Sequence, residues 1–156
     1  MTSTPPDTLA QQARTAPAPL LRLGLLSLVA IGIAGAAAEL AFERHWRGPV
    51  QFIPWAALVL LALGLVLLLA APRAITVVRV LAAVVLVVSA YGVFTHVSVN
   101  FGAGPSDPGW NALSSLTQWW YALTKTVGSA PPLAPGMLAQ GALLLLLAST
   151  MKRQHR

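Results

Sequence analysis

Four long apolar runs, nearly free of charged side chains, divide the chain at about residues 20–42, 53–71, 74–97 and 133–151. A helix of about 20 apolar residues crosses the roughly 30 Å hydrocarbon core of a bilayer. The second and fourth runs, which contain "AALVLLALGLVLLLAA" and "ALLLLLA", are apolar around the whole helix, whereas a soluble surface helix has a polar face. We therefore predict an all-α integral membrane bundle of four transmembrane helices.

Composition supports the same fold class. Of 156 residues, 56% are hydrophobic and 9% are charged, against about 25% charged in soluble domains. A buried bundle in a soluble protein is disfavoured because too little chain remains to cover four such helices. The missing cysteines exclude thiol–disulfide chemistry, a lipoprotein anchor and the common structural zinc sites.

The basic residues predict an orientation and account for the net charge of +6. Positively charged residues collect on the cytoplasmic side of membrane helices, where they also attract anionic lipid. We therefore expect a multi-pass protein of the plasma or inner membrane with both termini in the cytoplasm, and no nucleic acid partner. Seven basic residues lie on the predicted cytoplasmic side and three on the other: Arg14, Arg22, Arg73, Arg79, Lys152, Arg153 and Arg156 against Arg44, Arg47 and Lys125.

The two ends of the chain differ from the predicted transmembrane domain at residues 20–151. Residues 1–19 are rich in Pro, Ser, Thr and Ala without apolar periodicity, which predicts a flexible cytoplasmic tail. Residues 152–156 form a short basic cytoplasmic tail. A cleaved signal peptide ending at "AAAE" is the alternative interpretation of the first apolar run.

Two polar groups lie at the predicted outer end of the bundle. Glu39 and His45 belong to "ELAFERHW", and His96 and Asn100 continue a small or polar stripe from Ser89 on the third helix. Polar side chains of this kind commonly hydrogen-bond between helices, and ionisable ones are also candidates for function. We define Glu39, His45, His96 and Asn100 as the candidate polar cluster. Glu39, His96 and Asn100 are expected to be bonded to one another directly or through water.

A cofactor is the alternative role for this cluster. Glu39, His45 and His96 are suitable ligands for a divalent metal, and the two histidines for a haem iron. Both arrangements require the side chains to converge, and Arg44 and Arg47 beside His45 would repel a cation. We therefore predict no cofactor and no metal. No HExxH, phosphate-binding glycine loop or Ser–His–Asp pattern predicts a catalytic residue, so the chain is not expected to be an enzyme.

The segment between the third and fourth runs predicts an extracytoplasmic helix at about residues 108–127. Asp107 is a candidate N-cap, Pro108 suits the first helical position and Gly128 suits a stop. An amphipathic aromatic helix lies in the membrane interface, and a helix that docks a partner is the alternative. Its predicted apolar face consists of Trp110, Leu113, Leu116, Trp120, Leu123 and Val127.

Four segments carry a resemblance to a known group of proteins. They are "ELAFERHW", "QFIPW", "YGVFTH" with Asn100 four residues on, and "PPLAPGMLAQGALLLLL". Together they resemble an uncharacterised family of small bacterial four-span integral membrane proteins, over about residues 24–150. The family tends to be acidic after the third helix, whereas this chain has "HVSVNFGAGPSDPGW" there. The resemblance implies four spans and no known reaction.

Three classes of function remain open. A structural or accessory membrane subunit is expected first, with the lipid bilayer and a membrane protein or a second copy of the chain as partners. A haem or metal protein that uses His45, His96 and Glu39 is the second class. Small-solute transport is the third, and it would require an oligomer because two of the helices supply almost no polar lining.

The predicted orientation is tested with reporter fusions. Fusions after Trp46 and Lys125 should report an extracytoplasmic location, and fusions after Arg73 and Arg156 a cytoplasmic one, because of the bias in basic residues. A cytoplasmic signal after Trp46 would contradict this topology.

Overall fold

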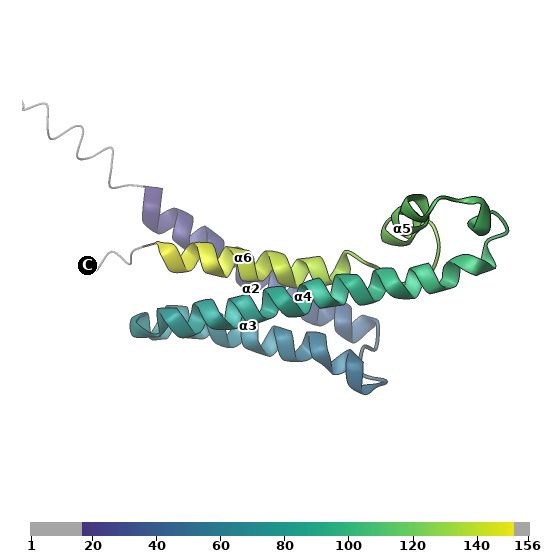
Figure 1. The fold of residues 1–156 in the computed structure, drawn as a ribbon. Coiled ribbons are helices and arrows are strands. Elements are labelled where there is room, and N and C mark those ends of the chain that lie inside the picture. Colours follow the sequence, from purple (N-terminus) through teal and green to yellow (C-terminus); the bar gives the residue numbers. More distant parts are fainter. Residues whose placement is uncertain (1–16, 152–156) are drawn as a thin grey trace, which may run out of the picture.

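The computed structural model describes residues 17–151 (Figure 1). Residues 1–16 of the predicted tail at 1–19, and the whole predicted tail at 152–156, lie outside the described residues, whereas residues 17–19 belong to the first long helix. The described chain is helical and contains no strand. Its four long helices are α2 (Pro17–Phe42), α3 (Ile53–Ala70), α4 (Ile75–Ala103) and α6 (Ala134–Thr150), and a short α5 (Ser115–Leu123) precedes α6. The all-α prediction is confirmed, and the four predicted runs agree closely with the long helices except at the end of α4.

Three of these helices are long and apolar enough to cross a membrane, namely α2, α3 and α4. The fourth, α6, is apolar but has only 17 residues, a length of about 25 Å at 1.5 Å per residue. This is at the lower limit for a spanning helix. Length and composition therefore establish three candidate spans, and the role of α6 depends on its packing.

The long helices form a bundle in which α2 and α4 occupy opposite corners (Figure 1). Each of them packs against both α3 and α6, so α6 is an integral member of the bundle. We call the end where α2 begins and α6 ends the terminal end, and the end where α2 passes into α3 the hairpin end. The core between the helices is apolar and includes Val29, Leu61, Val78, Val85 and Leu145.

Close contact between α3 and α6 depends on two glycines. A Cβ added to Gly64 would lie 2.7 Å from the side chain of Leu145, and one added to Gly141 would lie 2.8 Å from Leu61. A leucine side chain of the facing helix therefore packs directly against each glycine. Small residues at helix interfaces allow this approach of two backbones.

The outer surface of the bundle is apolar as well as its core. All four long helices expose large apolar side chains, for example Ile31 on α2, Val59 on α3, Val87 on α4 and Leu143 on α6. Exposed apolar area of this extent is rare on a soluble monomer. The outer surface is therefore compatible with contact to lipid.

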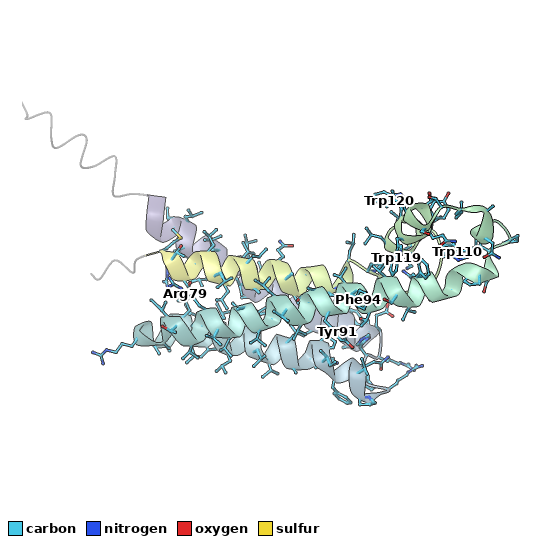
Figure 2. The ribbon with its side chains drawn as sticks, in the orientation of Figure 1. Arg79, Tyr91, Phe94, Trp110, Trp119 and Trp120 are labelled. Carbon is cyan, nitrogen blue, oxygen red and sulfur yellow. The ribbon has the colours of Figure 1, made fainter. Side chains whose placement is uncertain are left out.

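Helix α4 continues past the other helices at the hairpin end and supports α5 (Figure 1). A second small core forms there around Trp110, which covers Gly104 and meets the ring of Phe101 edge-on at 5.2 Å. Trp119 also stacks on the ring of Phe101, with ring centroids 4.4 Å apart. Figure 2 shows Trp110 and Trp119 in this part of the molecule. The six extra residues of α4 beyond the predicted end at Val97 are thus held by aromatic packing.

The predicted continuous helix at 108–127 is wrong in its extent. Residues Trp110–Ala112 form a separate 3-10 turn, and α5 begins only after Ser114, whose side chain caps it. Asp107 instead accepts a hydrogen bond from the N–H of Gly109, which closes a local turn. The helix ends at Leu123 because Lys125 adopts a left-handed conformation, with φ of 59°. Trp110 is buried in the second core with Ala122 of α5 and is not part of an exposed apolar face.

Among the described residues, the basic side chains are equally numerous at the two ends of the bundle, so the predicted excess on one side is not present there. Arg22, Arg73 and Arg79 lie toward the terminal end, against Arg44, Arg47 and Lys125 toward the hairpin end. The other four basic residues of the bias, Arg14, Lys152, Arg153 and Arg156, lie outside the described residues. The orientation therefore stays a prediction.

Gly128 provides a test of how the segment before α6 is held. Its φ is +75°, and an added Cβ would lie 2.6 Å from the Cα of Asn100. We expect Gly128→Ala to lower the free energy of unfolding by at least about 1–2 kcal/mol, since the left-handed region and the contact both disfavour a side chain. Thermal unfolding in detergent measures the loss. Gly136→Ala is the matched control because open space surrounds that position, and an equal loss in both variants would contradict this account.

Candidate functional site

A cavity of about 360 Å³ opens at the hairpin end of the bundle. Side chains from α2, α3, α4, α6 and the two connecting segments line it, and Glu39, His45 and His96 of the candidate polar cluster are among them. Residues separated by more than 50 positions in the chain therefore meet around one space. The fourth member of the cluster, Asn100, does not line it.

The end of α2 determines where His45 lies. The N–H of His45 donates to the carbonyl of Leu40 at 2.9 Å, and the N–H of Arg44 donates to that of Ala41 at 3.1 Å. This is the Schellman pattern, and its left-handed residue is Arg44, with φ of 49°. The helix therefore ends at Phe42 instead of continuing through Trp46, and the chain turns back so that His45 lines the cavity.

Side chains of α3 and its preceding turn hold this connection. The indole N–H of Trp55 donates to the carbonyl of His45 at 2.8 Å. The ring of Trp46 lies 6.3 Å from that of Trp55, and the side chain of Gln51 accepts a hydrogen bond from the N–H of Arg47. These contacts hold the segment from Glu43 to Phe52 against α3, and four of its residues line the cavity: Glu43, His45, Val50 and Gln51.

On α4 the predicted polar stripe faces the cavity through Ser89, Gly92 and His96. Gly92 allows α6 to approach, because an added Cβ would lie 3.0 Å from the ring of Pro135. Ser89 is 2% exposed, and its hydroxyl oxygen has no hydrogen-bond partner. A buried polar group without a partner is rare and costs about 1–3 kcal/mol. Ser89 is therefore an unused polar group at a surface of the cavity.

His96 is held by one hydrogen bond to the segment before α6. Its Nδ1 lies 2.7 Å from the carbonyl oxygen of Pro131. A carbonyl oxygen only accepts, so Nδ1 carries the proton, and in the neutral ring Nε2 is then an acceptor. The contact fixes the ring at the edge of the cavity.

Asn100 has a structural role that differs from the predicted one. Its side-chain NH₂ donates to the carbonyls of Ala122 and Ala130, at 3.0 and 2.8 Å, and its oxygen accepts from the N–H of Ala130 at 2.9 Å. With 0% exposure it joins α4 to the end of α5 and to the segment before α6. Among the described residues no direct hydrogen bond joins Glu39, His96 and Asn100; His96 and Asn100 bond instead to backbone groups of α5 and of the segment before α6. The expected bridging through water stays a prediction.

The charges around the cavity are negative. Glu39 and Glu43 line it, and its lining includes no Lys or Arg. Arg44 and Arg47 are exposed and lie outside the lining. The two arginines that we expected to repel a cation are therefore exposed residues that do not form part of the cavity surface.

A metal site is not formed among the described residues, where no group of three or more His, Asp or Glu side chains is placed to hold an ion. The polar lining instead surrounds an apolar floor that includes Val88 and Leu138. The arrangement is suited to a ligand with one polar and one apolar part.

Sequence reasoning identified the polar stripe of α4 but did not include Glu43, Gln51, Tyr91 or Thr95, which also line the cavity. Glu43 lies in the same motif as Glu39, and its closeness in the sequence is a signal by which it could have been predicted. Gln51 could not be found, because its position depends on the turn that ends α2.

Comparison with known proteins identifies no relative: no family model, no curated protein and no solved structure matches the chain. The cavity must therefore be interpreted from its own chemistry.

Single substitutions of Asn100 and His96 measure how much each side chain contributes to holding the segment before α6. Asn100→Ala removes three hydrogen bonds and leaves three backbone groups to find other partners. We expect it to cost about 2–4 kcal/mol of unfolding free energy, and His96→Leu, which removes one bond, about 0.6–2 kcal/mol. Thermal unfolding with amide hydrogen exchange over residues 104–133 measures both. A larger loss in His96→Leu would refute this assignment.

Proposed function

We propose that the protein is a four-span membrane protein of the plasma or inner membrane with both termini in the cytoplasm. The packing of α6 between α2 and α4 supports a fourth span, because a helix surrounded by three spanning helices shares their environment. Its 17 residues are uncharged and expose Leu143 and Leu147 to the outside. The seven-to-three bias of basic residues supports the orientation, which places the cavity at the extracytoplasmic face.

We further propose that the protein binds a small ligand in this cavity. The observation that carries the proposal is Ser89, a residue of the cavity lining whose hydroxyl oxygen is buried and has no hydrogen-bond partner. A ligand that bonds to this oxygen would remove the cost of leaving it unpaired. The volume of about 360 Å³ is within the range of small-molecule sites.

Binding agrees with the packing better than conduction through a single chain does. Between the cavity and the terminal end, the described core is filled by apolar side chains such as Val29, Val78, Val85 and Leu145. A solute would meet no polar path there, and a pore requires one. We therefore do not propose transport by a single copy of the chain.

The exposed face of α5 favours the accessory-subunit function as a second candidate. Leu116 is 82% exposed and Trp120 is 60% exposed on α5, which packs against the extended end of α4. Figure 2 shows Trp120 on the outside of α5. Aromatic residues on an amphipathic helix are typical of membrane interfaces. We propose that α5 lies in the interface next to the cavity, where it can also meet a membrane partner.

Native mass spectrometry tests the binding function. Protein purified in mild detergent should carry a bound small molecule, and Ser89→Leu should lose it because the larger side chain fills the cavity. Ala90→Leu is the matched control on the exposed face of the same helix. Equal retention by wild type and both variants would contradict the proposal, as would a wild-type protein without any bound molecule.

A further inference from the structure

We infer that the cavity takes an ammonium group attached to an apolar body. This inference rests on the proposed binding function and assigns the chemical class of the ligand. Its first support is charge: the chain has ten basic and four acidic residues, yet two of the acids line this cavity and none of the basic residues in the described chain does. The cavity is therefore a negative site in a positively charged protein.

The position of the two acids at the C-terminal end of α2 adds to this charge. The carbonyl end of a helix carries a partial negative charge, which favours cations and disfavours carboxylates. Glu39 lies in the last turn of α2 and Glu43 follows it, and that turn contains no basic residue. The partial charge at the end of α2 and the charges of both carboxylates are thus all negative. They repel one another, and a cation in the cavity would offset this repulsion.

The hydrogen-bonding groups around the cavity favour a donor. Carboxylates accept hydrogen bonds only. The hydroxyl of Thr95 already donates to the carbonyl of Gly92 at 2.8 Å, so its free capacity is that of an acceptor. Ser89 has an unpartnered hydroxyl, which can accept as well as donate, and His96 offers Nε2 as an acceptor when Nδ1 carries the proton. Gln51 and Tyr91 add donors to the lining. An ammonium group can bond to the carboxylates and the other acceptors, whereas a carboxylate or phosphate would meet the like charge of the two carboxylates.

The remaining lining selects an organic cation over a metal ion. No group of three metal ligands is formed among the described residues. Val88, Ile53 and Leu138 supply an apolar wall, and the ring of Tyr91 also lines the cavity and can face a cation. The ligand that satisfies both parts is amphipathic, and two sources of it are a soluble alkylamine and a lipid with an amino headgroup.

Calorimetric titration of the full chain in phosphatidylcholine nanodiscs tests the assignment. The probes are hexylamine, hexanol and hexanoate, which share one tail and differ in the headgroup, and empty nanodiscs correct for partitioning. We expect hexylamine to bind at least about tenfold more tightly than the other two, as one charge-assisted contact would provide. Hexanol or hexanoate binding as tightly as hexylamine would overturn the ammonium assignment.

Variants show whether the acids provide this selectivity. Glu39→Gln should weaken hexylamine about tenfold and leave hexanol unchanged. Asp107→Asn is the matched control, because it removes the same charge at an exposed site outside the cavity. Equal weakening by both variants would mean that net charge, and not the cavity, attracts the amine, and would overturn the proposal. Circular dichroism confirms that each variant retains its helices.

The same titration distinguishes a lipid headgroup from a soluble amine as the source of the ammonium group. Weaker hexylamine binding in nanodiscs that contain phosphatidylethanolamine assigns the site to the lipid headgroup, and unchanged binding assigns it to a soluble amine. If hexylamine does not bind, the ammonium assignment is wrong. The binding function is judged separately, by the molecule retained in native mass spectrometry, so the two can fail independently.

Discussion

The apolar outer surface of the bundle leaves its polar side chains only two places to find partners, the interior and the ends. A lipid environment cannot satisfy a hydrogen-bonding group, so each polar side chain within the bundle must bond to protein, water or a ligand. Most follow this rule: Arg79 meets Ser149 at the terminal end, and Asn100 and His96 bond to backbone carbonyls of the segment before α6. The architecture at the hairpin end is largely a consequence of these bonds.

Two buried side-chain atoms among the described residues do not follow the rule, the Nε of Arg22 and the hydroxyl oxygen of Ser89. Arg22 lies near the terminal end, and its guanidinium already donates to the carbonyl of Leu68 at 3.3 Å. Ser89 has no bond from its side chain, and it lies next to a cavity lined by acids and histidines. The exception at Ser89 is the basis of the proposed binding site, whereas Arg22 is a partly satisfied anchor.

The sequence predicted the long helices well because each apolar run is uniform and bounded by charged residues or prolines. It also predicted the polar stripe from Ser89 to Asn100, whose two end residues are buried in the structure, since period and polarity are local properties. It failed where the geometry depends on distant contacts or on an unusual backbone conformation. The break before α5 follows from the burial of Trp110 over Gly104, and the position of His45 follows from the left-handed Arg44. Neither residue carries a local signal for that conformation.

The most direct test of the account is the reactivity of a single cysteine in the cavity, since the native chain contains none. Ser89→Cys is treated with a trimethylammonium methanethiosulfonate and with its sulfonate counterpart, and Val85→Cys, one turn deeper in the apolar core, is the control. The account predicts that Cys at position 89 reacts, faster with the cationic reagent, and that position 85 does not. No reaction at position 89, or a faster reaction with the anionic reagent, would contradict a negative, accessible cavity.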